Sequence, residues 1–288
     1  MRPPRLGVEL KIVFQLFSNK SPDEKISVIE KLLMFNESFL FPLFFGLFYV
    51  IILPFISVFF ERLLIFTKSF KIENTYRVET KKIKDKIFTI KLGLEFFNAN
   101  GKEGVKKFNE IGITNLMLDL KLKDIPETVY KAIKALDDIE FGFLTIHGQG
   151  GKKLIENAKK AASEIKSKPN IMMVTILTAL SDSDLKDLGN DNTVVEQVGK
   201  LAKMAKEMKV GVICSGHEAK IVRKIIGSDL LIFTPGIRMQ NENKDDQKRV
   251  CTPKESIKNG ASKIIMGRSL MKGDIEENLN QVAASIKI

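Results

Sequence analysis

The sequence predicts an α/β protein whose main part is a (β/α)₈ TIM barrel. From about residue 85 onward, apolar runs of strand length alternate with Lys-, Glu- and Ala-rich segments of helical periodicity. Strands that alternate with helices indicate βα units and therefore a parallel sheet. Several runs end in small or polar residues followed by glycine, which is typical of the loops at the working face of a barrel. A doubly wound open sheet is the alternative fold.

The expected elements follow one another regularly along this part of the chain. Seven strands are predicted, at Ile87–Leu92, Ile113–Leu118, Phe141–Ile146, Ile171–Leu177, Val210–Cys214, Asp229–Phe233 and Lys263–Met266. Between them, the segments Lys152–Ile165 and Val194–Met208 have clear helical periodicity. Seven strands leave the predicted barrel one strand short of closure, so it is expected to be incomplete.

Residues 1–80 are unlike the rest and are expected to form an apolar, helical N-terminal segment before a barrel domain at 81–288. Within this segment, residues 38–60 are 23 consecutive uncharged residues rich in Phe, Leu and Ile. A run of this length can span a bilayer as a helix, which predicts membrane association. Pro42 and Pro54 would kink or break such a helix, so a re-entrant or interfacial hairpin is an alternative. A buried helix of a globular domain is another.

Composition excludes some classes of function. The net charge is +11, but the lysines are scattered along the helical segments, and there are only three Tyr and no Trp to stack on bases. We therefore expect no binding of nucleic acid, and some attraction for phosphorylated substrates. Cys214 and Cys251 lack the spacing of metal ligands, and so few cysteines suit a reducing compartment. We expect the barrel to be cytoplasmic.

The most informative stretch is Asp119–Thr128, which contains the pattern D-x-K-x-x-D directly after a predicted strand. Side chains on a strand alternate between its faces, so Asp119 and Lys121 are expected to lie side by side. Asp124 falls in the following loop, where parallel α/β folds carry their chemistry. A surface ion-pair cluster is the simpler interpretation of such a pattern taken alone.

Read as D-x-K-x-x-D-I-P-x-T, this stretch resembles the signature of the orotidine 5'-phosphate decarboxylase family of bacteria. Further similar motifs occur in the family's order: Lys91–Glu95 (K-x-G-x-E), Thr145–His147 (T-x-H), Thr175–Thr178 (T-x-L-T), Thr234–Arg238 (T-P-G-I-R), Asp245–Arg249 (D-D-Q-x-R) and Gly267–Ser269 (G-R-S). The resemblance covers residues 85–285. The last three motifs separate this family from sugar-phosphate decarboxylases that share only D-x-K-x-x-D.

The resemblance implies decarboxylation of orotidine 5'-phosphate to UMP in pyrimidine biosynthesis, without a cofactor or metal. Loss of CO₂ leaves a carbanion, which the enzyme must stabilise electrostatically and then protonate. By resemblance, Lys121 is the proton donor and Asp119 lies near the departing carboxylate. Lys91 pairs with Asp119, and Asp124 completes a catalytic array of alternating charge.

The resemblance also implies the substrate-binding residues and a homodimer. In the family, the counterparts of Asp124 and Thr128 reach into the active site of the other subunit. Arg is suited to phosphate through its planar, bidentate fork. The implied substrate-binding residues are Thr128, Ile125, Thr178 (at the pyrimidine), Pro235, and, around the phosphate, Arg238, Gln247, Gly267 and Arg268.

Other polar residues are given structural roles. His147 is expected to cap a loop by hydrogen bonding rather than act as a general acid, because a lysine already supplies the proton. Ser215 and His217 have no evident third partner for nucleophilic catalysis and are interpreted as loop residues. The glycine cluster Gly148–Gly151 is compatible with a phosphate cradle, but such clusters are common in plain turns.

The beginning of the chain departs from the family. The family's first strand ends in A-L-D, whose aspartate binds the ribose, and no such strand is evident upstream of Lys91. The run Leu10–Phe17 lies too early and lacks the aspartate, while Tyr76–Thr80 is short and polar. We therefore expect an open seam between the second and eighth strands and reduced activity. The alternative function is an inactive or impaired barrel remnant that is fused to a membrane-associated segment and has a binding role or none.

Overall fold

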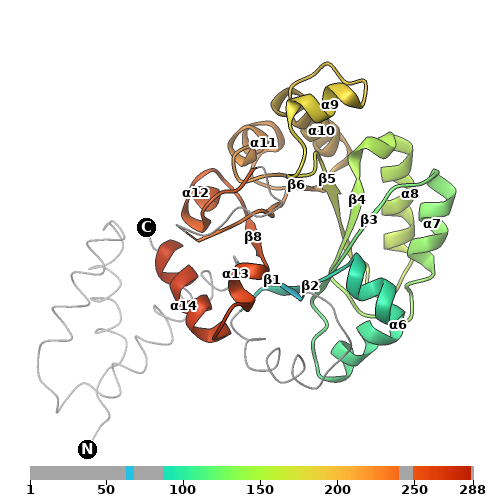
Figure 1. The fold of residues 1–288 in the computed structure, drawn as a ribbon. Coiled ribbons are helices and arrows are strands. Elements are labelled where there is room, and N and C mark those ends of the chain that lie inside the picture. Colours follow the sequence, from blue (N-terminus) through green and yellow to red (C-terminus); the bar gives the residue numbers. More distant parts are fainter. Residues whose placement is uncertain (1–62, 68–86, 240–248, 287–288) are drawn as a thin grey trace, which may run out of the picture. The chain divides into compact units, whose positions relative to one another are not determined.

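The computed structural model describes residues 63–67, 87–239 and 249–286. The described strands form one closed, all-parallel barrel in sequence order, and the helices lie outside it (Figure 1). The strands are β1 (Leu63–Thr67), β2 (Thr89–Gly93), β3 (Leu116–Leu122), β4 (Phe143–His147), β5 (Asn170–Val174), β6 (Gly211–Ile213), β7 (Ile232–Thr234) and β8 (Lys263–Met266). The predicted TIM barrel is therefore confirmed, and the open sheet is not observed.

The helices follow the strands as the predicted βα alternation requires. They are α6 (Leu94–Glu110), α7 (Pro126–Lys134), α8 (Gly151–Ser163), α9 (Asp182–Asp187), α10 (Val194–Met208), α11 (Ala219–Ile226), α12 (Pro253–Lys258), α13 (Arg268–Met271) and α14 (Ile275–Ile286), with a short 3₁₀ helix η3 (Gly148–Gly150). Helix α10 has the predicted bounds, and Thr193 and Glu196 form a capping box at its N-terminus.

Strand β1 occupies the place of the first strand that the sequence did not reveal. It pairs in parallel with β2, where Ile65 is opposite Ile90, and with β8, where Ile65 is opposite Met266. The expected open seam between the second and eighth strands is therefore wrong. The five residues of β1 lie inside the segment that was set apart as residues 1–80, just after its long apolar run. Without alternation or flanking turn residues, no local pattern marks them as a separate strand.

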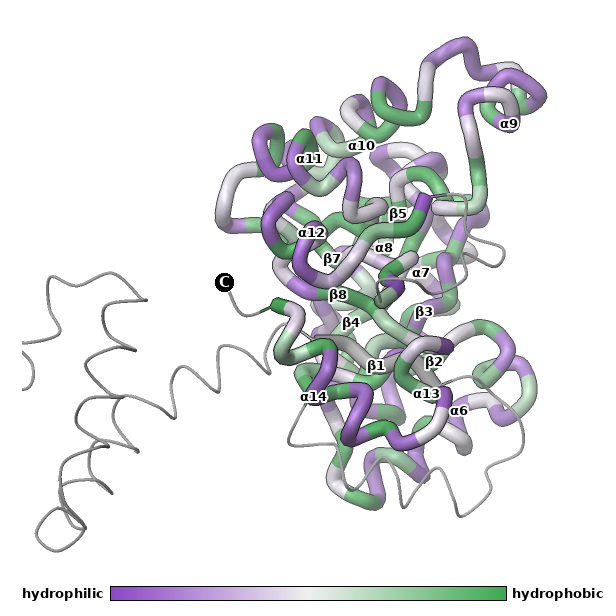
Figure 2. Tube along the Cα trace, turned by 60° about the vertical axis from the view of Figure 1, so that its left-hand side comes forward, coloured by the Kyte–Doolittle hydropathy of each residue, from purple (hydrophilic) through white to green (hydrophobic). Residues whose placement is uncertain are grey.

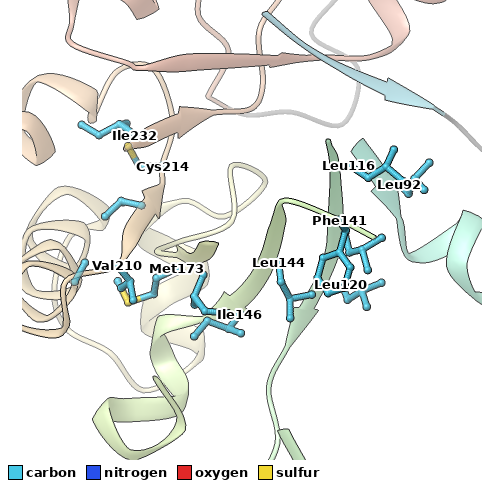
Figure 3. Packing of buried hydrophobic residues seen from close by; sticks show 14 of the residues in the cluster. Leu92, Leu116, Leu120, Phe141, Leu144, Ile146, Met173, Val210, Cys214 and Ile232 are labelled. Carbon is cyan, nitrogen blue, oxygen red and sulfur yellow. The ribbon is translucent and has the colours of Figure 1, made fainter. Parts of the chain in front are cut away.

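The core has two layers, because side chains alternate between the inside and the outside of the barrel. A larger layer packs between the strands and the helices, and Figure 3 shows part of it, including Leu116, Leu144 and Met173. A smaller cluster, consisting of Met117, Phe143, Met172, Val174, Ile213, Phe233 and Ile265, fills the barrel axis. Figure 2 shows the corresponding pattern, with hydrophobic strands and helices that alternate between polar and apolar residues. This filled axis supports the side chains at the C-terminal end of the strands.

The predicted membrane contact concerns residues that the structure does not describe. Residues 38–60 lie outside the described ranges. Within those ranges, no helix combines the length and the apolar character needed to cross a membrane. The barrel belongs to a compact unit that extends from Ser57 to Ile288.

Candidate active site

Two neighbouring strands place a charged cluster at the mouth of the barrel. On β3, Met117 belongs to the axial cluster, so Asp119, two residues further on, also points inward. Asp119 accepts a hydrogen bond from Lys91 of β2 at 2.7 Å (Nζ to Oδ2) and from Lys121 at 2.8 Å (Nζ to Oδ1). Lys91 and Asp119 are each 7% exposed, whereas the Lys121 side chain is 30% exposed. The cluster therefore presents Lys121 to the solvent side and buries the other two charges.

The electrostatic environment favours the ionised form of Asp119. Burial opposes the negative charge of Asp119, but the charges of Lys91 and Lys121 and their hydrogen bonds outweigh it. The pKa of Asp119 is therefore held well below its ordinary value. Burial lowers the pKa of Lys91, and the attraction of Asp119 opposes this shift. One carboxylate between two ammonium groups leaves a net positive charge, which suits an anion or a developing carbanion.

Lys121 lies at an irregularity in β3. The register with β4 is regular up to Leu118, opposite Leu144, and resumes only at Leu122, opposite Ile146. Between these pairs, Lys121 adopts a left-handed conformation with φ of +48°. For a residue with a side chain this costs on the order of 1–2 kcal/mol. The Lys121 N–H donates to the side-chain hydroxyl of Thr145 on β4 at 2.8 Å.

The charged cluster opens into a cavity of about 510 Å³ at the C-terminal end of the strands. Residues at and after the ends of β5, β6, β7 and β8 form the rest of its lining. The sequence-predicted residues that line it are Lys91, Asp119, Lys121, Thr178, Pro235, Arg238, Gly267 and Arg268. This volume lies in the range of small-molecule sites. Arg238 and Arg268 add further positive charge to the lining of this cavity.

Backbone hydrogen bonds join the two ends of the segment that follows β7. Cys251 donates its N–H to the Gly236 carbonyl at 3.1 Å and accepts from the Arg238 N–H at 3.1 Å. Gly236 has a φ of +75°, which glycine adopts without steric cost. Arg238 is 8% exposed and donates to the carbonyl of Ile237. This bridge fixes the two ends of the segment that contains Gln247, which itself lies outside the described residues.

Arg249, near the C-terminal end of that segment, contacts two other loops. Its guanidinium donates to the carbonyls of Ile176 and Leu177, at 3.2 and 2.8 Å, directly before Thr178. It also forms an ion pair with Glu218, which is buried. The Glu218 carboxylate in turn accepts from the Ser215 N–H at 2.9 Å. The loops after β5, β6 and β7 are therefore held together by one arginine.

Three predicted site residues lie apart from the cavity. Asp124, Ile125 and Thr128 are exposed on the loop after β3 and at the start of α7, and Ile125 is 66% exposed. The Asp124 carboxylate accepts only the Ile125 N–H at 2.7 Å among the contacts described for it. Within the described residues of this subunit, they do not join the charged cluster.

The histidines and Ser215 behave as structural residues, with one correction. His217 Nε2 lies 2.6 Å from the Val250 carbonyl, and the Ser215 hydroxyl accepts from the His217 N–H. His147 was expected to cap a loop by hydrogen bonding. Its Nδ1 is instead buried without a partner among the described residues. Burial and then the charges of Lys123 and Lys121 lower its pKa, so a neutral ring avoids the cost of charging it there.

Sequence reasoning gave no role to Thr145, Glu218 or Arg249. Thr145 and Arg249 lie inside family-like motifs, but their contacts depend on side chains that come together only in the fold. Glu218 follows Ser215 and His217, and only its charge at a strand end could have marked it.

Comparison with known proteins places the chain in a family. The model of the Orotidine 5'-phosphate decarboxylase / HUMPS family matches residues 77–281. Orotidine 5'-phosphate decarboxylase of Wolbachia pipientis subsp. Culex pipiens is 43% identical over 189 residues, which are 65% of this chain and 82% of that protein. The enzyme of Ehrlichia canis is 40% identical over 211 residues, 73% of this chain and 91% of the relative.

Solved structures agree with the sequence relatives. The crystal structure of orotidine 5'-phosphate decarboxylase from Lactobacillus acidophilus matches with a TM-score of 0.66 and 33% identity, covering 79% of this chain and all of the other. An uncharacterized conserved protein from Geobacillus kaustophilus, 24% identical with a TM-score of 0.65, shares the fold. On the family match and these relatives, the chain belongs to the orotidine 5'-phosphate decarboxylase / HUMPS family.

Proposed function

We propose that this chain converts orotidine 5'-phosphate to UMP and carbon dioxide, with Lys121 as the proton donor. The observation that carries this proposal is the Lys91–Asp119–Lys121 cluster, in which Lys91 and Asp119 are buried and which lines the same cavity as Thr178 and Arg268. The relatives at 43% and 40% identity carry this activity in their names. The reaction belongs to pyrimidine biosynthesis and is a carbon–carbon lyase step.

In the proposed step, the bond between C6 of the pyrimidine and its carboxylate carbon breaks. The electron pair remains on C6, CO₂ leaves, and a proton from Lys121 Nζ forms the new C–H bond. Lys121 then regains a proton from water. The ammonium groups of Lys91 and Lys121 stabilise the developing charge, and a buried, preorganised site makes this more effective than in water.

Asp119 has two parts in this proposal. Its carboxylate orients Lys121 through the 2.8 Å contact and, placed beside the substrate carboxylate, disfavours the charge that is lost as CO₂. Lys91 holds Asp119 from the other side, at 2.7 Å. The three side chains thus keep their alternating charges while the substrate loses the charge of its carboxylate.

The other wall of the cavity is proposed to bind the rest of the nucleotide. Thr178 donates to or accepts from the pyrimidine, while Arg268, Arg238 and Gln247 bind the phosphate. Pro235 and Gly267 bring backbone close to it, and Arg provides the bidentate geometry that phosphate accepts. Arg268 and Arg238 line the same cavity as the lysines, which supports this assignment.

A homodimer is part of the proposal, with Asp124, Ile125 and Thr128 completing the site of the partner subunit. Their exposure on the loop after β3 is compatible with this role. The predicted membrane contact of residues 38–60 and the cytoplasmic location of the barrel also remain proposals. No observation on the described residues favours an inactive barrel remnant. The sequence after β1 continues with Lys68 rather than aspartate, so reduced activity stays a prediction.

The test is turnover of orotidine 5'-phosphate by the full chain, followed by ultraviolet absorbance, with Lys121→Ala alongside. We expect turnover by the unmodified chain and a loss of kcat on the order of 10³-fold or more in the variant, because the general acid and a stabilising charge are both removed. Absence of turnover by well-folded protein would contradict the proposed function. Rescue of weak turnover by an aspartate introduced after β1 would identify the missing ribose contact.

A further inference from the structure

We propose that Thr145 is a positioning residue of this active site, whose single hydroxyl holds both the backbone of Lys121 and the carboxylate of Asp119. The inference rests on the proposed decarboxylase function, in which those two residues meet the substrate. Thr145 itself does not line the described cavity and is not proposed to touch the substrate.

The location of Thr145 directs its hydroxyl toward β3. It follows Phe143 by two residues on β4, and Phe143 belongs to the axial cluster, so both side chains point into the barrel. Thr145 is 0% exposed, so water does not reach it. A buried hydroxyl requires partners within the protein, and those of Thr145 are both on β3.

The direction of both hydrogen bonds follows from chemistry. A hydroxyl has one donor and can accept twice. The Lys121 N–H can only donate, at 2.8 Å, and the ionised Asp119 can only accept, at 3.1 Å to Oδ1. Thr145 therefore accepts from the proton donor's backbone and donates to the carboxylate that orients its ammonium group. No other arrangement of the hydroxyl proton satisfies both contacts.

These contacts lie at the place where β3 and β4 lose their regular pairing. Between Leu118 and Leu122 the register shifts, and Lys121 takes its left-handed conformation there. The Thr145 hydroxyl bridges the two strands inside this interval. Asp119 Oδ1 accepts from both Thr145 and Lys121 Nζ. The hydroxyl therefore holds the Lys121 backbone directly and the Lys121 ammonium group through Asp119.

Three variants distinguish a positioning role of the Thr145 hydroxyl from a merely structural role of a buried threonine. Thr145→Val keeps the shape and removes the hydroxyl, while Thr145→Ser keeps the hydroxyl and removes a methyl group. Thr89→Val is the matched control. Thr89 is also buried on an inward-facing position, and its hydroxyl donates to the Asn115 carbonyl at the opposite, N-terminal end of the barrel.

The experiment measures kcat and KM for orotidine 5'-phosphate and the Kd for UMP with the full chain. For Thr145→Val we expect kcat to fall by about 10- to 100-fold, equivalent to roughly 1.4–2.7 kcal/mol of transition-state stabilisation. We expect KM and the Kd for UMP to change by less than about threefold, because the binding wall is untouched. Thr145→Ser should recover kcat to within about threefold of the value for the unmodified chain. The kcat of Thr89→Val should equal that of the unmodified chain. If Thr145→Val does not fold, Thr145→Ala takes its place with the same expectation.

A second readout does not depend on turnover. Amide hydrogen exchange at Lys121, followed by nuclear magnetic resonance, should accelerate in Thr145→Val and stay slow in Thr145→Ser and Thr89→Val. Unchanged exchange, unchanged kcat in Thr145→Val, or equal losses of kcat in Thr145→Val and Thr89→Val would each overturn the proposal. Absence of turnover by the unmodified chain would instead overturn the proposed function, and exchange at Lys121 would still decide the contact.

Discussion

The two walls of the cavity are built differently. On the β2–β3 side, the polar groups belong to the strands themselves: Lys91, Asp119 and Lys121 all lie within strand bounds, and Thr145 of β4 supports them from behind the cavity lining. On the other side, Thr178, Pro235, Arg238, Gly267 and Arg268 all follow the ends of β5, β7 and β8. One wall is therefore carried by hydrogen-bonded ladders, and the other by connecting segments.

This difference suits the two tasks proposed for the site. Groups that act on the reacting atom must be held within a fraction of an ångström, and strand positions provide that precision. Groups that bind the remainder of a nucleotide are commonly carried on loops. The comparison predicts that changes on the strand wall lower kcat, whereas changes on the loop wall mainly raise KM.

Asp119→Asn tests the strand wall most strongly after Lys121 itself. We expect kcat to fall on the order of 10²-fold or more, because Lys121 loses its orienting charge. Removing one partner of a buried ion pair also leaves Lys91 uncompensated, so the free energy of unfolding should fall by about 3 kcal/mol. Steady-state kinetics and urea unfolding measure the two effects.

The control for this variant is Asp138→Asn. Asp138 also pairs with two lysines, Lys102 at 2.7 Å and Lys106 at 3.1 Å, but its side chain is 46% exposed. Solvent screens an exposed pair of this kind, so stability and kcat should hardly change. Equal destabilisation by the two variants would show that burial of the Asp119 cluster is not what matters.

Arg268→Ala tests the loop wall. We expect KM for orotidine 5'-phosphate to rise by about 10- to 100-fold through loss of a charge-assisted phosphate contact. A larger loss in kcat than in affinity would break the contrast between the walls. Lys224→Ala, which removes an exposed charge on α11, is the control and should leave KM unchanged.

Arg249→Met tests whether the loops that carry the binding groups depend on a common anchor. Arg249 does not line the described cavity but joins the loops before Thr178 and after β7. We expect a rise in KM of about three- to tenfold, since binding groups on both loops lose a common anchor. Glu218→Gln and the double variant complete a double-mutant cycle. Additive effects would show that the Arg249–Glu218 ion pair does not couple the loops.

The pH dependence of stability provides the smallest effect. The pKa of Asp119 is depressed in the folded chain, so its contribution to stability is present above the ordinary value of 3.8 and is lost as pH falls below it. The difference in unfolding free energy between the unmodified chain and Asp119→Asn should therefore be constant near neutral pH and shrink in acid. A difference that grows in acid would contradict the assignment.

Much of this architecture could be predicted from the sequence because it depends on local patterns. Helix α10 has the predicted bounds Val194–Met208, and β8 has the predicted bounds Lys263–Met266. Alternation along one strand predicted that Asp119 and Lys121 lie side by side, whereas the pairing of Lys91 with Asp119 was implied by the family resemblance. Both lysines contact Asp119, at 2.7 and 2.8 Å. Periodicity was sufficient for the helix, the strand and the Asp119–Lys121 pair.

The features that were missed depend on contacts between distant segments. Strand β1 was not recognised because its partners, β2 and β8, are separated from it in sequence and its own five residues carry no alternation. The left-handed Lys121 departs from the regular strand that alternation assumes. Its stabilising partner, Thr145, lies 24 residues away. No local rule relates these positions.

The most direct test of the central claim is decarboxylation of orotidine 5'-phosphate by the full chain in deuterated water, followed by nuclear magnetic resonance of the product. Proton transfer from a solvent-exchanged Lys121 predicts UMP that carries deuterium at C6, formed on the order of 10³-fold more slowly by Lys121→Ala. UMP formed by Lys121→Ala within tenfold of the unmodified rate would contradict the account, because the lysine could not then be the proton donor.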